Sequence, residues 1–449
     1  MSHLTAQSGY SSLIERLNRF PQGAPPSELL TKILTLLFSE KEAGLIGQLP
    51  IQPFSAARAA YLWGVREVEA FRMLEGLAER ALLLDTEQEN GEKLYVLPPP
   101  MAGFLEFSLM KVRTDIDQQA LSGLLYQYLN VEQDFIKALF MEGKTRPGRF
   151  FVNEEAIPQA SLARVLDYER ASAVVSEARR IGLGTCYCRH KMQHLGRACS
   201  APLELCMTFD SVADPLIRHG HAREIDAVEC LDLLQKSREL NLVQFGENVQ
   251  GGVSFICNCC SCCCDALIAA RKFCNLHPVQ TTNFLAQLSC NSCNGCGRCV
   301  DACPVQAVGL VSAHDPRHRT LRRAVLAPAR CLGCGICVRV CHSGALTLAP
   351  RQTRVITPVD SAHRIVLMAV ERGKLQHLIW DNRALFSHRA MAAIIGVILR
   401  LPALKQSLAS SQLGSKYLDA MIKKHTNGSH RELETLAETR TPATLKPRR

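Results

Sequence analysis

The spacing of apolar residues predicts three helices and a hairpin in the first quarter of the chain. Apolar side chains from Leu29 to Leu37 repeat on one helical face, and Ser27 precedes them as a cap. SAARAAYLWG predicts a second helix and REVEAFRMLEGLAERALLL a third. Two apolar runs then flank Asn-Gly at 90–91, which favours a hairpin turn. This is the element order of a winged helix, which we predict for residues 27–98.

The remaining apolar pattern is helical on either side of a central block. Residues 99–180 predict a helical connector, in which LDYERASAVVSEARRIGLG forms an amphipathic helix ending at Gly182 or Gly184. Helical spacing returns after residue 361 and predicts a helical tail over residues 355–425. Residues 426–449 are polar, and we expect them to be disordered.

Cysteine divides the 449-residue chain, because all 21 cysteines lie between Cys186 and Cys341. The length is sufficient for several domains with cores of their own. The N-terminus lacks a basic segment followed by an apolar one, and the longest apolar run, MAAIIGVIL, is too short to span a bilayer. We therefore expect a cytoplasmic protein, in which dense cysteine indicates metal or redox chemistry rather than disulfides.

The net charge of +10 is unevenly distributed. Residues 351–449 hold 17 Lys and Arg against 7 Asp and Glu, and this basic tail could pack on the core, contact an acidic protein, or lie peripherally on a membrane. Residues 27–98 hold 7 basic against 11 acidic residues, with Asp85 expected to be exposed in the wing. Because phosphate contacts dominate nucleic-acid affinity, we do not expect this domain to bind DNA.

One cysteine spacing occurs twice near the end of the cysteine-bearing region. CNGCGRCVDACP and CLGCGICVRVC both space four cysteines by two, two and three residues, as bacterial two-cluster ferredoxins do. In that motif the fourth cysteine of each run ligates the other cluster. The expected ligand sets are therefore Cys293, Cys296, Cys299 and Cys341, and Cys331, Cys334, Cys337 and Cys303. Residues 286–350 resemble dicluster ferredoxins, which implies two 4Fe-4S clusters, although His342 replaces the proline of the second motif.

A second cysteine block lies upstream, within residues 181–280. Its ten clustered cysteines are Cys186, Cys188, Cys199 and Cys206, followed by Cys257, Cys259, Cys260, Cys262, Cys263 and Cys264. Packing does not require thiols at this density, since Val or Ala would fill the space without the risk of oxidation. We predict a helical cysteine-rich domain that holds at least one further iron–sulfur cluster.

The distribution of these ten thiols has two interpretations. One cluster could use Cys186, Cys188, Cys199 and Cys206, with another on four of the six later thiols; this is favoured because the first four already form a complete set. Alternatively, a single non-cubane cluster could share thiols from both motifs. Zinc or copper(I) is the alternative metal. We expect Cys230 and Cys274 in the core, and His190 and His194 as solvated polar residues.

The upstream motifs also carry a resemblance. The patterns CxCR, CxxPxxxC and CNCCxCCC occur here in order, starting at Cys186, Cys199 and Cys257. This stretch resembles the amino-terminal half of ferredoxin-like iron–sulfur proteins of anaerobic bacteria and archaea, which often have a winged-helix-like N-terminus. The resemblance implies a redox protein and names no substrate. The expected fold is α+β multidomain: winged-helix-like domain, helical cysteine-rich domain, dicluster domain and helical tail.

These features together predict a multi-cluster electron-transfer protein that works with a redox partner as its donor or acceptor. One alternative is an iron–sulfur oxidoreductase with a catalytic cluster in the Cys186–Cys264 block. A redox-sensing regulator that uses the winged helix is the other. The sequence has no GxGxxG after a predicted strand and no Walker loop, so a nicotinamide, flavin or ATP would be bound by the partner.

Overall fold

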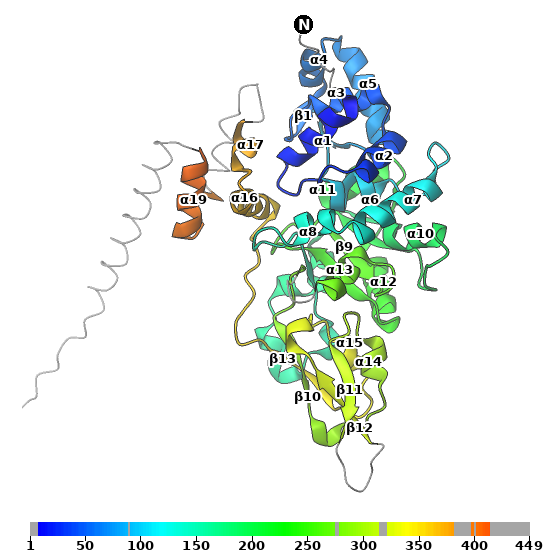
Figure 1. Cartoon of the computed structure of the whole chain (residues 1–449), viewed down its shortest axis with the longest axis vertical. Coiled ribbons are helices and arrows are strands. Elements are labelled where there is room, and N and C mark those ends of the chain that lie inside the picture. The colour runs from blue at the N-terminus through cyan, green and yellow to red at the C-terminus, as the bar shows by residue number, and fades with distance from the viewer. Residues whose placement is uncertain are drawn as a thin grey trace, which may run out of the picture.

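A computed structural model describes residues 8–88, 90–273, 278–313, 321–380, 397–398 and 401–413. Helices of the N-terminal part lie at the top of Figure 1, a central sheet with its helices lies below them, and the region of the two ferredoxin-like motifs is at the bottom. Cys274 and the segment 426–449 lie outside the described residues. No helix in the described ranges is long and apolar enough to cross a membrane.

The N-terminal part contains the predicted helices and hairpin, together with α1, α3 and β1, which the pattern did not predict. The Ser27 hydroxyl accepts a hydrogen bond from the Leu30 amide, which confirms the predicted cap. Strands β1, β3 and β2 form a small antiparallel sheet in that order. The elements are α1 (Gly9–Arg19), α2 (Glu28–Leu37), α3 (Glu40–Gly47), β1 (Phe54–Ser55), α4 (Ala56–Trp63), α5 (Glu67–Glu79), β2 (Leu84–Glu87) and β3 (Lys93–Val96).

Asp85 of β2 is fully buried, so the expectation of an exposed acidic side chain at this position is wrong. Its carboxylate pairs with Arg218 and lies 3.0 Å from Nε2 of His219 and 3.6 Å from Nζ of Lys93. Arg218 and His219 lie at the end of α11 (Asp210–Arg218), which belongs to the central part. A buried carboxylate needs such partners, and they attach the hairpin to α11.

The connector between residues 99 and 180 is less regular than the predicted helical segment. Its long amphipathic helix is replaced by the short helix α9, and Gly182 and Gly184 lie in strand β5. A Cβ on Gly182 would lie 2.8 Å from Oγ1 of Thr208, so close strand packing explains the glycine there. The elements are η1 (Pro100–Phe104), α6 (Leu105–Phe107), α7 (Gln118–Tyr126), η2 (Gln127–Val131), α8 (Asp134–Phe140), β4 (Gly148–Phe150), η3 (Glu154–Ala156), η4 (Gln159–Arg164), η5 (Asp167–Glu169) and α9 (Ala171–Glu177).

A six-stranded antiparallel sheet forms the central part, so the prediction of a helical cysteine-rich domain is wrong. The strand order is β4-β8-β9-β6-β5-β7. These strands are short, between three residues in β4 and six in β6, and a short apolar run does not distinguish a strand from a helix, which is why the sequence did not reveal them. The elements are β5 (Ile181–Thr185), α10 (Tyr187–His194), β6 (Glu204–Phe209), α11, β7 (Ala222–Ile225), α12 (Ala227–Glu239), β8 (Val243–Glu247), β9 (Phe255–Cys259) and α13 (Asp265–Lys272).

The two faces of this sheet have different chemistry. Met207 and Ile256 pack with α9 and α12 in a separate apolar core, which also contains Cys230 as expected. The opposite face presents Cys206 and Cys257, which are direct partners across β6 and β9. Because side chains alternate along a strand, Cys259 lies on the same face as Cys257. The sheet therefore directs part of the thiol block toward the N-terminal helices.

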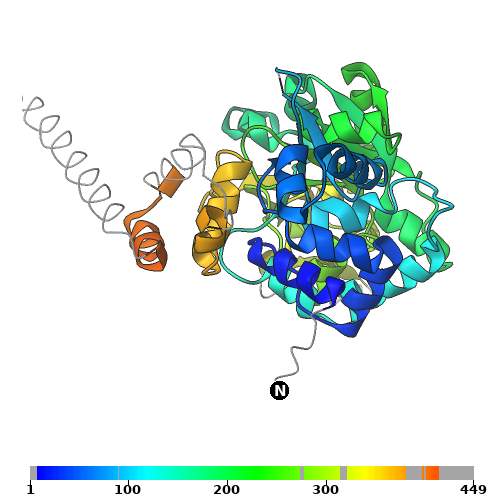
Figure 2. The ribbon, with the colours of Figure 1, turned by 90° about the horizontal axis from the view of Figure 1, so that it is seen from above.

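The two ferredoxin-like motifs lie among two hairpin-like strand pairs. Antiparallel pairs join β10 to β13 and β11 to β12. Beyond them, α16 of the basic tail packs on the core: Arg364 pairs with Glu247 at 2.7 Å and Arg372 donates to the carbonyl oxygen of Pro21. Figure 2 shows these C-terminal helices beside the main body. The elements are β10 (Phe284–Leu288), η7 (Cys290–Ser292), α14 (Arg298–Ala302), β11 (Val308–Ser312), β12 (Arg322–Leu326), η8 (Pro328–Arg330), α15 (Ile336–Arg339), β13 (Leu346–Pro350), α16 (Ser361–Glu371), α17 (Leu375–Trp380) and α19 (Ala403–Leu413).

The contact between the N-terminal and central parts predicts a dependence of stability on pH. Nε2 of His221 bonds to the carbonyl oxygen of Glu79, and burial lowers the pKa of His221 from 6.5 to about 4, with Lys111, Arg113 and His219 adding to the effect. Below pH 6.5 the unfolded chain therefore binds a proton that the folded chain does not. We expect the free energy of unfolding to fall by about 2 kcal/mol between pH 7 and pH 5 because of this group.

Guanidinium unfolding at both pH values, under anaerobic conditions, checks this expectation. His221→Gln keeps a donor for Glu79 and cannot titrate, so its loss of stability between the two pH values should be about 2 kcal/mol smaller than that of the wild type. Equal losses in the two proteins would show that His221 is not responsible.

Candidate metal centres

Two small cavities lie in the region of the repeated motifs, and each has four cysteines in its wall. The first is lined by Cys293, Cys296, Cys299 and Cys341, and the second by Cys303, Cys331, Cys334 and Cys337. Each cavity thus combines three cysteines of one motif with the last cysteine of the other. These are the sets expected from the sequence, and ligation itself remains a prediction.

The backbone around both cavities suits a thiolate-bound cluster. Gly295 and Gly333 occupy equivalent places in the two motifs and have φ angles of +71° and +74°, a region that disfavours other residues. A Cβ on Gly295 would lie 2.2 Å from the carbonyl oxygen of Arg322. Backbone amides reach the sulfurs as well: Ala307 N lies 3.2 Å from Sγ of Cys303, and amide donors of this kind tune cluster potentials.

Residues 292–345 match the family of the 4Fe-4S dicluster domain. All eight cysteines of the two cavities lie within the matched segment, so the chain carries an iron–sulfur domain of this type. No curated protein and no solved structure matched the chain.

The two sites of the dicluster domain differ in exposure. Cys296 of the first site is exposed, whereas Cys331 and Cys337 of the second are buried, and burial raises the pKa of Cys337 to about 12. The second site also contacts the central part, because the Cys334 carbonyl oxygen accepts a hydrogen bond from the Asn153 amide at 2.9 Å. We call the first the outer site and the second the inner site.

Upstream of the dicluster domain, four thiols form a compact group near the surface. The sulfurs of this four-thiol group, all within 4.8 Å of one another, belong to Cys199, Cys260, Cys262 and Cys263. Cys262 is exposed and Cys263 is buried. A hydrogen bond from Cys263 lowers the pKa of Cys260 to about 5, so one thiolate, the form that binds metals, is already favoured.

The other six upstream thiols line a large cavity, together with Cys260 of the four-thiol group. This six-thiol group consists of Cys186, Cys188, Cys206, Cys257, Cys259 and Cys264. Cys186 and Cys264 cap α10 and α13, Cys188 lies in the first turn of α10, and the others lie on β6 and β9. A hydrogen bond from Cys206 lowers the pKa of Cys257 to about 5. Burial opposes ionisation of Cys188, but hydrogen bonds from Cys186 and Cys264 lower its pKa overall.

This division differs from the favoured interpretation of the sequence. Cys199 groups with Cys260 and its neighbours, whereas Cys186, Cys188 and Cys206 face Cys257 and the cavity. Both groups thus mix thiols from the two motifs, because β6 and β9 are adjacent in the sheet although about fifty residues separate them in the sequence. Four thiolates in one place suit a single soft ion or a cluster, and six exceed the four of a cubane.

Buried cations accompany the thiols. Arg189 is 1 % exposed and donates to the carbonyl oxygens of Asn258 and Pro202. Burial lowers its pKa, but the nearby thiols of Cys186 and Cys260 raise it overall, so Arg189 stays charged. Its neighbour His190 is buried with Nδ1 2.8 Å from the carbonyl oxygen of Leu109, so the expectation of a solvated histidine is wrong at this position. A buried cation here stabilises the anionic form of the thiols.

A second buried cation, Lys191, contacts both carboxylate oxygens of Asp265 at 2.6 and 2.7 Å. The same carboxylate accepts hydrogen bonds from Tyr187 and Asn130 and lies 3.8 Å from Sγ of Cys188. Burial would lower the pKa of Lys191, but the facing carboxylate raises it. This pair was not predicted from the sequence. Its position beside the cysteines could have indicated it, because Lys191 lies three residues after Cys188 and Asp265 directly follows Cys264.

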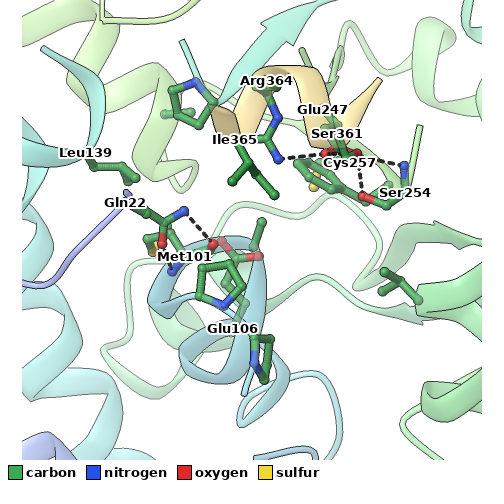
Figure 3. Close-up of a pocket in the computed structure, with 18 of the residues that line it drawn as sticks. Gln22, Met101, Glu106, Leu139, Glu247, Ser254, Cys257, Ser361, Arg364 and Ile365 are labelled. Carbon is green, nitrogen blue, oxygen red and sulfur yellow. Dashed lines mark hydrogen bonds and ion pairs between the residues drawn. The ribbon is translucent and has the colours of Figure 1, made fainter. Parts of the chain in front are cut away.

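The large cavity has a volume of about 500 Å³. Its walls come from the N-terminal part, the connector, the central sheet and α16, and include the six-thiol group. Figure 3 shows Glu106 and Gln22 on one side and the Glu247–Arg364 pair on the other, with Ile365 between them. Burial raises the pKa of Glu106 well above its usual range, which favours the protonated form of this carboxyl group.

The grouping of cysteines in the dicluster domain predicts the effect of removing one of them. Cys303→Ala should abolish the cluster of the inner site, held by Cys331, Cys334 and Cys337, and leave the outer site intact although Cys299 is closer in sequence. EPR spectra of the reduced protein and its iron content measure this. Cys290→Ala removes an exposed thiol that lines neither cavity and should change nothing. Loss confined to the outer site would contradict the assignment.

Proposed function

We propose that this chain is an electron-transfer protein in which the dicluster domain exchanges electrons with at least one further metal centre held by the upstream thiols. The observation that carries this proposal is a buried hydrogen-bonded connection between the two regions. The dicluster domain supplies one-electron carriers, and the thiol groups supply soft ligands for iron.

The connection starts at the inner site. The Cys334 carbonyl oxygen accepts from the Asn153 amide, and two residues earlier the Phe151 amide donates to the Gln244 carbonyl oxygen at 3.0 Å. The Gln244 side chain then donates to Oδ1 of Asn258 at 3.0 Å. Asn258 lies between Cys257 and Cys259 of the six-thiol group. Each of the four linking residues is at most 4 % exposed, so the connection runs through protein rather than water.

We propose the outer site as the docking place for the redox partner. Cys296 is exposed there, next to the exposed residues Arg298 and Arg322. Positive charge beside an exposed cluster favours an acidic partner, because complementary charge speeds encounter. We therefore propose an acidic one-electron carrier protein as the partner at the outer site, with electrons passing to the inner site and then to the six-thiol group.

The N-terminal part fits a structural role in this scheme. We propose a winged-helix-like domain that closes the cavity rather than one that reads DNA. Support comes from Asp85, which attaches β2 to α11, and from Glu79, whose carbonyl oxygen bonds to His221. These contacts engage the predicted wing and the end of α5 with the central part, which disfavours the regulator alternative.

Metal content tests the first part of the proposal. Anaerobically purified protein should hold clearly more than the eight irons of a 4Fe-4S dicluster domain. Cys257→Ala should lower the excess and leave the dicluster irons, since Cys257 belongs to the six-thiol group. Cys230→Ala is the matched control, because Cys230 is a buried thiol in the separate core. Saturation of the wild type at eight irons would refute an upstream iron centre.

Electron entry tests the second part. Cys334→Ala should remove the inner cluster while leaving upstream iron in place. An acidic ferredoxin is too large to enter the cavity that the six-thiol group lines, so it should then reduce the centre held by that group at least tenfold more slowly than in the wild type. Dithionite, a small reductant, should still reduce it. Stopped-flow spectra at matched iron content measure both rates, and an unchanged rate with ferredoxin would show that electrons do not pass through the inner site.

A further inference from the structure

From the cavity of about 500 Å³ we infer a binding site for an uncharged, largely apolar organic molecule, placed so that the bound molecule abuts the six-thiol group. This inference deepens the proposed function and rests on it for the presence of a redox centre at the thiols. It identifies the class of ligand that would contact such a centre.

The size and the lining of the cavity define the class of ligand. Small-molecule sites commonly enclose 300–1,000 Å³ and combine apolar walls with a few polar groups. Apart from the thiols, the walls are mostly apolar and include Phe20, Leu97, Leu139, Phe140, Ile365 and Met368. Pro53, Ala102 and Gly252 of the lining are exposed, so the cavity is not sealed from solvent. A metal–thiolate centre alone does not require a cavity of this size with mostly apolar walls.

The charges in the wall are already compensated. The Glu247 carboxylate takes an ion pair from Arg364 at 2.7 Å and hydrogen bonds from Ser254 and Ser361, as Figure 3 shows. Arg189 lies beside the thiols of Cys186 and Cys260. Among the described lining residues, Glu106 is the acidic side chain without a counter-charge, and burial raises its pKa and so favours its neutral form. An ionic ligand would therefore lose its hydration without gaining a partner, which favours an uncharged one.

One polar group in the wall can orient such a molecule. The Glu106 carboxyl group faces the cavity on the side of the N-terminal part, and Gln22 lies nearby with its amide engaged by both backbone groups of Met101. Gln22 is thus occupied, whereas burial favours the protonated form of Glu106, which can donate one hydrogen bond to a ligand in the cavity. We therefore expect a ligand with one hydrogen-bond acceptor, such as a carbonyl group, on an otherwise apolar skeleton.

The test uses Nile red, an uncharged apolar dye with a carbonyl group, and the full-length protein purified without oxygen. We expect saturable binding of one dye per chain with a blue-shifted emission. Ile365→Trp fills the cavity from α16 and should weaken binding at least tenfold; Leu139→Trp, from α8 on the other wall, should do the same. The control Ala362→Trp lies on the exposed side of α16 and should bind like the wild type. Equal affinity in all four proteins at matched iron content would overturn the inference.

A second readout tests the position of the ligand. Bound dye should shift the EPR signal of the upstream centre in the reduced protein and leave the dicluster signals unchanged. Binding that depends on Ile365 but leaves every signal unchanged would overturn the contact with the six-thiol group. A protein that binds dye in this Ile365-dependent way but holds no upstream iron would refute the proposed function, so the two failures are distinguishable.

Discussion

The ion pair between Lys191 and Asp265 holds the upstream thiols in one place. Lys191 belongs to α10, which begins after Cys186, and Asp265 begins α13 directly after Cys264. Asn130 of η2 adds a bond to the same carboxylate, so the connector joins the two helices there. Both charges are almost completely buried, and removing either would leave the other unpaired, a change that typically costs 3–5 kcal/mol. The geometry of the six-thiol group depends on this contact.

Charge balance explains why the pair is retained in such a buried place. Thiolates and the clusters they hold are anionic, and an anion in a low-dielectric interior needs cations nearby. Arg189 supplies one beside the thiols, and Lys191 favours the anionic form of Cys188 even though it is paired with Asp265. Among the described residues after position 350, Arg364 also reaches the cavity wall, but its charge is balanced by Glu247.

The dicluster domain could be predicted from the sequence because a cluster fixes its ligands by local spacing, and the motif around Cys293 is repeated around Cys331. The N-terminal helices were also predictable, since Ser27 and the apolar stripe after it are local signals. The central sheet was not. Its thiols come together through pairing of distant strands, and nothing near Cys206 indicates that Cys257 will lie opposite. Asp85 was misassigned for a related reason: its partners Arg218 and His219 are more than a hundred residues away.

The position of α16 has a consequence for how the protein is assembled during synthesis. Every cysteine precedes residue 342, whereas the wall containing Arg364 and Ile365 is translated afterwards. On a ribosome, the β-sheet and both thiol groups can therefore form while that side of the cavity is still open. The six thiols are therefore more accessible during this interval than in the finished protein. Once Arg364 pairs with Glu247, access to the six thiols is limited to the openings of the cavity that remain in the folded protein.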